Sequence, residues 1–288
     1  MKGFSFDRRY YSSRGGTARP PAPIDEGMLR ELVLSLYSDF NSRGYFEEAM
    51  GYVCYDGWRD HGTMGPDPKA YAFLRLRKSG LWPINEQGNY SETDLFDLIE
   101  FMHDHISKPT KTQYHSIDRS NHSEDWDRMA GQTEYREVVN TFLCDYRKGY
   151  ELSVEGHVLE QGDFGLERLL TEKAPSADSK NVVEKMQAAI LMFRRHGASL
   201  EDKRSAVVIL AGILEHLRPD IQKVLTRKDE GDLFALANGF GLRHHNQDQK
   251  TEYDLAVFVP GMFYYYLTMI HMCLRLIERF NQAPAPFP

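Results

Sequence analysis

The chain has 288 residues, 41% hydrophobic and 27% charged, which is the composition of an ordinary globular protein with room for two modest domains. A formal net charge of -7 argues against sequence-independent wrapping of DNA. Three widely separated cysteines argue against a disulfide framework and against a cysteine-rich zinc site. Because the N-terminal residues contain no apolar core of a secretory signal, we expect a cytoplasmic protein.

The N-terminal part of the chain is predicted to be mostly helical. Residues 1–24 are rich in Arg, Ser, Gly and Pro and are expected to form an extended arm. Residues 25–173 form the predicted N-terminal domain, in which Asp25 and Ser91 occupy helix-capping positions. Ser91 also begins a Ser-x-x-Asp pattern, a variant of the capping box. Apolar periodicity predicts helices that follow Asp25, span 45–55 and 69–77, follow Ser91 and span 133–147.

A polar, histidine-rich stretch at 107–131 separates two of these helices and raises the question of a metal site. The relevant side chains are His103, His105, His115 and His122, with Asp104, Asp118 and Asp125 nearby. Such groups can ligate metals. However, their spacing matches no zinc pattern, and residues two apart on a helix diverge by about 200°. We therefore expect solvated surface histidines and predict no metal and no cofactor.

The chain then changes character twice. Apolar and polar residues alternate on both sides of Gly156, which predicts a small β-hairpin near 149–160. Small residues at 174–180 suggest a linker and a domain boundary. A helical bundle is predicted over 181–281, with Ser199 capping one helix and Gly239 ending another. Its helices are expected at 182–195, 199–217, 218–226, 229–238 and 260–280.

The last of these helices contains the longest apolar run of the chain. Residues 255–274 carry no formal charge and are long enough to cross a bilayer. Pro260, His271 and three consecutive tyrosines at 264–266 fit a buried helix that begins at Pro260 better than a lipid-exposed span. We interpret this segment as a core helix and expect no membrane partner.

The segment just before this helix holds the strongest candidate for catalysis. Arg243, His244, His245 and Asn246 combine a permanent cation, two groups that titrate near neutrality and an amide. RNA cleavage without metal needs a base, an acid and a cation for the phosphate, and these side chains supply each type. Composition alone could also place two histidines in a polar connection, with Arg243 paired structurally to a carboxylate. Signatures of P-loop NTPases, dinucleotide-binding folds, α/β-hydrolases and zinc proteases are missing.

The segments LFALANGFGLRHHNQDQK and YDLAVFVPGMFYYYLTMIHMCLRLIER resemble the C-terminal module of AbiJ-type abortive-infection proteins, which belong to the HEPN superfamily of helical bundles. FSFDRRY and the GYELSVEGHVL hairpin resemble the N-terminal modules attached to those proteins. The resemblance implies an anti-phage effector that cleaves RNA without metal. The HEPN signature places a histidine four to six residues after its arginine, whereas this chain has Gln247, Asp248, Gln249 and Lys250 at 247–250.

Two functions therefore stay open at this stage. The first is a HEPN-type ribonuclease with Arg243, His244, His245 and Asn246 in catalysis, and with Gln247 and Lys250 as RNA contacts. The alternative is a non-catalytic binding or regulatory subunit of a defence complex, which would contact another defence protein. A homodimer is expected through the C-terminal bundle, because the last helix is apolar almost all round. Its expected interface residues are Phe263, Tyr264, Tyr265, Met269 and Met272.

Overall fold

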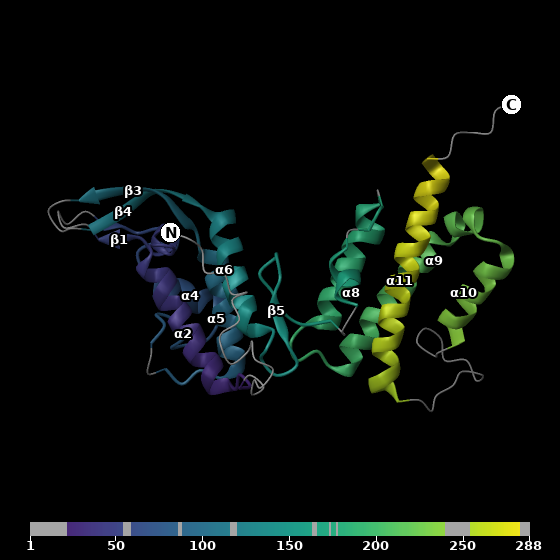
Figure 1. Ribbon diagram of the computed structural model, residues 1–288, viewed down its shortest axis with the longest axis horizontal. Coiled ribbons are helices and arrows are strands. Elements are labelled where there is room, and N and C mark those ends of the chain that lie inside the picture. The colour runs from purple at the N-terminus through teal and green to yellow at the C-terminus, as the bar shows by residue number, and fades with distance from the viewer. Residues whose placement is uncertain are drawn as a thin grey trace, which may run out of the picture. The chain divides into compact units, whose positions relative to one another are not determined.

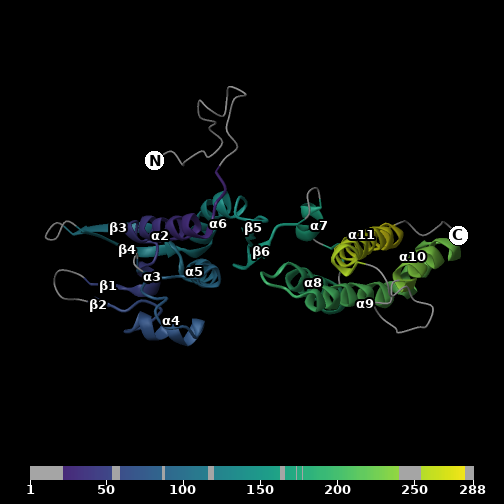
Figure 2. The same ribbon diagram turned by 90° about the horizontal axis from the view of Figure 1, so that it is seen from below.

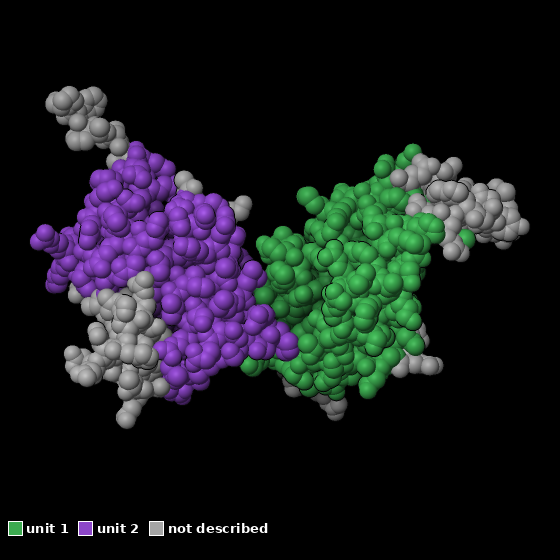
Figure 3. Space-filling view, turned by 180° about the vertical axis from the view of Figure 1, so that it is seen from behind, with its two compact units in different colours: residues 1–159 green, residues 160–288 purple. Residues whose placement is uncertain are grey.

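The computed structural model describes residues 22–53, 59–85, 88–115, 120–162, 166–172, 174–176, 178–239 and 254–282. Over these ranges the chain is mostly helical, and each sheet has only two strands (Figure 1). The mostly α fold class is thus confirmed. The chain divides into two compact units, Met1–Leu159 and Glu160–Pro288 (Figure 3). Each unit has its own hydrophobic core.

The division between the units falls after Leu159, ahead of the linker predicted at 174–180. The short helix α7 (Glu167–Thr171) lies between these two points. Leu166, Leu169 and Leu170 pack against the core of the second unit. The chain therefore contributes apolar side chains to the second core before it reaches the small-residue stretch.

Three helices begin at the capping residues that the sequence predicts. Asp25 accepts a hydrogen bond from the Met28 amide at 2.8 Å and starts α2 (Glu26–Ser42). Ser91 starts α5 (Glu92–His105), and Ser199 starts α9 (Leu200–Val224), each with a complete capping box. In both boxes the serine and an aspartate three residues later satisfy each other's free backbone amides, which stabilises the first turn.

The first unit is built around α2, α5 and α6 (Arg128–Leu143). Leu29, Leu98, Ile99 and Val139 from these helices are completely buried in its core. Figure 2 shows α4 (Pro68–Leu76) and the strands β1 (Tyr52–Val53) and β2 (Arg59–Asp60) on one side of α5, with α2 and the β3–β4 hairpin on the other. The one-turn helix α3 (Glu47–Met50) precedes β1.

Several predictions for the first unit need correction. The helix expected at 45–55 is only the single turn α3, which ends at Gly51 with φ of 74°. The polar stretch at 107–131 contains the antiparallel strands β3 (Lys108–His115) and β4 (Ser120–Asp127). Their pairing shifts between Pro109 and Thr112, and polar side chains hide the strand alternation. The helix predicted at 133–147 is α6, which starts earlier because the Asp127 carboxylate caps the Ala130 amide at 2.9 Å.

The predicted β-hairpin is confirmed as strands β5 (Tyr150–Leu152) and β6 (Val158–Glu160). It is attached to α6 because the Asn140 side-chain oxygen accepts from the Leu152 amide at 2.6 Å, while its nitrogen donates to the Leu152 carbonyl at 3.2 Å. It is attached to α5 because the Val158 amide donates to Glu100 Oε1 at 2.7 Å. The hairpin therefore belongs to the architecture of the first unit.

The second unit continues with a π-helical turn η1 (Ser179–Val183), which leads into α8 (Glu184–Arg194) and then α9. The helices α10 (Arg227–Gly239) and α11 (Leu255–Gln282) follow. The long helix α9 packs against both α8 and α11. The Phe193 and Phe263 rings stack with centroids 3.8 Å apart. The helices predicted separately at 199–217 and 218–226 form the single helix α9, which contains Pro219. A proline inside a helix costs about 3 kcal/mol, and burial of Leu217 and Ile221 offsets that cost.

The last helix begins at Leu255, not at Pro260 as predicted. Asp254 starts it by accepting from the Ala256 amide on its side chain at 2.9 Å, so Pro260 lies inside the helix. By length and composition alone α11 could cross a membrane, yet 56% of its most apolar window is buried in the protein. Phe263, Leu267 and Ile270 are completely buried in the second core, as expected of a core helix.

Candidate functional site

The cluster predicted from sequence lies outside the described residues. Arg243, His244, His245 and Asn246 fall there, as do the proposed RNA contacts Gln247 and Lys250. On either side the chain is helical, since α10 runs to Gly239 and α11 starts at Leu255. The cluster thus belongs to the connection between two helices of the second unit.

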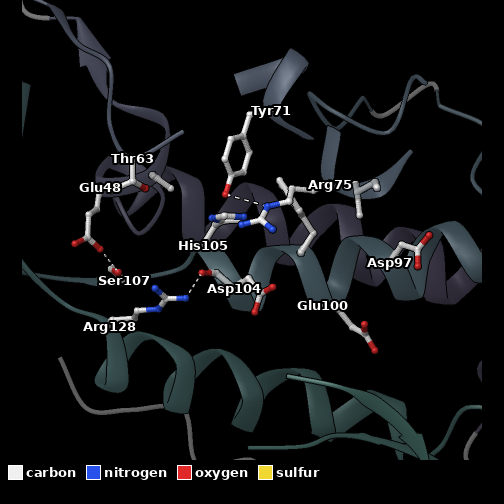
Figure 4. Close-up of a pocket in the computed structure, with 13 residues that line it drawn as sticks. Glu48, Thr63, Tyr71, Arg75, Asp97, Glu100, Asp104, His105, Ser107 and Arg128 are labelled. Carbon is white, nitrogen blue, oxygen red and sulfur yellow. Dashed lines mark hydrogen bonds between the residues drawn. The ribbon is translucent and has the colours of Figure 1, made fainter. Parts of the chain in front are cut away.

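A polar cavity of about 560 Å³ lies in the first unit between α4 and α5 (Figure 4). Six parts of the chain line it: α3, the residues after β2, α4, α5, Ser107 just after α5, and Arg128 at the start of α6. Its polar side chains are Glu48, Thr63, Tyr71, Arg75, Asp97, Glu100, Asp104, His105, Ser107 and Arg128. Many groups that accept or donate hydrogen bonds therefore converge on one small volume.

Helical periodicity explains how α5 contributes five of the thirteen lining residues. Asp97, Glu100, Phe101 and Asp104 stand at positions i, i+3, i+4 and i+7, which lie on one face of a helix. The opposite face, with Leu98, Ile99 and Met102 among others, is buried in the core. Burial of that face fixes the rotation of α5, so the four side chains lie on the part of the helix surface that lines the cavity. Tyr71 and Arg75, one turn apart on α4, face it from the other side (Figure 4).

Hydrogen bonds hold several lining side chains in place. Ser107 donates through its hydroxyl to the Glu48 carboxylate, which joins α3 to the end of α5. Arg128 donates to the Asp104 carbonyl at 2.6 Å, and Arg75 Nε donates to the Tyr71 hydroxyl at 3.4 Å. Both guanidinium groups keep further N–H donors beyond these bonds, because each guanidinium has five. The cavity wall is thus ordered while part of its donor capacity is left for a ligand.

His105 sits at the centre of the lining, between two aromatic rings. Its imidazole is 4.5 Å from the Phe101 ring and 5.3 Å from the Tyr71 ring, measured between centroids. Burial lowers the pKa of His105 to about 4, against a smaller opposing effect of Asp104. The imidazole is therefore neutral at physiological pH and offers one donor and one acceptor.

The carboxylates of the cavity differ in environment. Burial raises the pKa of Glu100, and the Val158 amide opposes this rise by donating to the carboxylate. Asp97 lies at the edge, where Lys78 Nζ approaches its carboxylate at 2.7 Å. Opposite charges on facing elements and a neutral imidazole suit a polar small molecule with both donors and acceptors. Among the described residues no group of three or more His, Cys, Asp and Glu has the arrangement of a metal site.

The expectation of solvated histidines is wrong for His103 and His105. His103 is 2% exposed, and His105 is half-buried on the cavity wall. Two sequence signals pointed to this region: the polar line along a helix that is otherwise buried, and two histidines in its last turn. Glu48, Tyr71, Arg75 and Arg128 gave no such signal, because only the packing of separate elements brings them together.

Comparisons with protein-family models, with curated proteins and with solved structures found no match for this chain. The functional proposals below therefore depend on the chemistry of the residues themselves.

Proposed function

We propose that this chain is a prokaryotic anti-phage effector whose second unit cleaves RNA, with Arg243, His244, His245 and Asn246 as catalytic residues. The observation that carries the proposal is the concentration of a guanidinium, two imidazoles and an amide in four consecutive residues. Two features support the proposal that the second unit is a HEPN-like bundle: the unit is helical, and the cluster lies in the sequence between two of its helices. The resemblance to HEPN proteins also implies that the chain acts as a homodimer, in which the clusters of the two copies would share one cleft.

The chemistry needs no metal. His244 or His245 takes the proton of an RNA 2′-hydroxyl, whose oxygen attacks the adjacent phosphorus. The bond from phosphorus to the 5′-oxygen breaks, and a protonated histidine gives that oxygen a proton. The products are a 2′,3′-cyclic phosphate and a 5′-hydroxyl. Arg243 holds the phosphate as negative charge develops, and Gln247 and Lys250 contact the RNA beside it.

The test is cleavage of labelled RNA by the full chain in the presence of EDTA. We expect the double variant His244→Ala/His245→Ala to lose cleavage with an unchanged melting temperature, because two histidines in a polar connection contribute little packing. Arg243→Lys should also reduce the rate, since an ammonium cannot reproduce the guanidinium fork. The control is His157→Ala, which removes an exposed histidine of the first unit and should leave cleavage intact.

Full cleavage by the double variant would overturn the catalytic proposal, and so would a loss of cleavage that unfolding explains. The second candidate function is a non-catalytic recognition subunit, and the polar cavity of the first unit favours it. In that case the wild-type chain cleaves no RNA, and phage restriction by the wild type and by the double variant is equal.

A further inference from the structure

A second cavity, of about 310 Å³, lies wholly within the second unit, between α7 and α11. Four polar residues of α11 line it: Thr268, His271, Arg275 and Arg279. They stand at i, i+3, i+7 and i+11, so they share one face of the helix. The opposite wall comes from Leu169 of α7 and from Glu172, the residue just after this helix. The functions proposed above make no use of this cavity.

His271 is the most unusual residue of this lining. It is 3% exposed, and among the described residues neither ring nitrogen has a hydrogen-bond partner. The Leu169 backbone lies close enough to raise the pKa of His271 somewhat, but no hydrogen bond of proper geometry joins them. Burial outweighs this effect and lowers the pKa, so the imidazole is neutral near pH 7. A buried polar group without a partner costs about 1–3 kcal/mol, and proteins usually satisfy such groups with water or a ligand.

The charges around His271 are not balanced. The Arg275 guanidinium is bound to the Glu172 carboxylate, so these two charges compensate each other. Arg279 lines the same cavity and has no ion pair within the part of the chain that the structure describes. One guanidinium charge is therefore left over. It stands two turns from His271 along the same face of α11.

The remaining lining is apolar. Leu169 of α7 faces Met272 and Leu276 of α11 across the cavity. A volume of this size is at the lower end of what small-molecule sites occupy. A ligand that fits must therefore be small, with one polar end for His271 and Arg279 and a less polar remainder against these three side chains.

We propose that this cavity binds a singly charged oxyanion on an apolar or aromatic body, either a phosphodiester or a carboxylate. Arg279 supplies the compensating charge, and the neutral imidazole of His271 donates a hydrogen bond to one oxygen of the anion. One negative charge matches the exposed Arg279, the guanidinium of this lining that has no ion pair among the described residues. The proposal does not depend on RNA cleavage, because none of its residues belongs to the 243–246 cluster.

The test is titration calorimetry on the full chain with two probes, the dinucleoside monophosphate UpA and sodium octanoate. The first presents a phosphodiester and the second a carboxylate, so the probe that binds identifies the source of the anion. Arg279→Gln should weaken binding about tenfold or more, because hydrogen bonds to charged groups contribute about 1.5–3 kcal/mol. Arg227→Gln removes an exposed arginine from α10 of the same unit and should leave binding unchanged.

A second variant separates binding from folding. His271→Leu removes both buried nitrogens, so we expect binding to be lost while the melting temperature stays the same or rises. Absence of binding of both probes would overturn the proposal. So would an equal effect of Arg279→Gln and Arg227→Gln, since binding would then reflect general charge alone. Because RNA cleavage is measured separately, failure of either proposal leaves the other standing.

Discussion

At the scale of single residues, the first unit depends on a histidine that must stay neutral. His105 packs between Tyr71 and Phe101 on the cavity wall, and its pKa is about 4 instead of 6.5. The unfolded chain therefore binds a proton between these two pH values that the folded chain does not bind. The contribution of His105 to the free energy of unfolding must then fall as the pH drops from about 6.5 to about 4. Above this window the contribution is constant.

We predict that His105→Gln reduces this loss of stability on acidification. The wild-type free energy of unfolding should fall by up to about 3 kcal/mol over the window because of His105. Chemical unfolding of both proteins at pH 7 and pH 4.5 measures the difference. His157→Gln is the control, because His157 is exposed, and this variant should lose as much stability as the wild type. If His105→Gln and the wild type lost the same free energy of unfolding between pH 7 and pH 4.5, the pH dependence would not come from His105.

At the scale of elements, the β5–β6 hairpin is fitted closely against α5. Gly156 in its turn has φ of 88°, and a Cβ atom added there would lie 2.4 Å from Nδ1 of His103. His103 is itself buried and cannot move away without disturbing the core. The glycine is therefore required twice, for its backbone conformation and for the space that it leaves.

Gly156→Ala should accordingly destabilise the first unit by about 3 kcal/mol or more, the range of severe single substitutions. Gly80→Ala provides the matched control, because Gly80 has φ of 80° and no neighbouring atom within 4 Å of the added Cβ. That variant should lose only about 1–2 kcal/mol, the cost of the left-handed conformation. Thermal melting compares the two, and equal losses would mean that the contact with His103 has no energetic effect.

At the scale of the whole molecule, the side chains of α11 that the second core does not bury are available for contact with a second copy of the chain. Phe263 and Tyr264, which the sequence suggested for a dimer interface, are buried within the second unit. Tyr265 and Met269 are half-buried, and Met272 is exposed. Other exposed large apolar residues of α11 are Val257, at 65% exposed, Phe280, at 54%, and Phe258, at 39%. These last residues are the ones left for contact with a second copy.

We predict a homodimer in light scattering, and we expect Val257→Glu and Phe280→Glu each to shift it to monomer without a large change in melting temperature. Burial of a charge at an apolar interface without a partner is unfavourable, whereas an exposed site tolerates it. Val154→Glu is the control, since Val154 is 69% exposed on the hairpin of the first unit. A wild-type monomer at micromolar concentration would show the prediction to be wrong.

Local sequence signals determined most of the helix starts and the mostly α class. Asp25, Ser91 and Ser199 act within their own first turns, so their effect can be recognised without knowledge of the fold. The β5–β6 hairpin was equally recognisable from its alternation around Gly156. Where local signals are weak, as in the polar strands β3 and β4, the pairing partner decides the structure, and the prediction failed.

The cavities were decided by tertiary structure. Glu48, Arg75, His105 and Arg128 come from the four elements α3, α4, α5 and α6, and only the tertiary structure of the first unit makes them neighbours. Likewise, His271 looked like one polar residue in an apolar run, and only the packing of α7 against α11 gave it Glu172 and a cavity. Burial sets the protonation of both histidines. Burial depends on residues distant in the chain, so no reading of neighbouring residues could supply it.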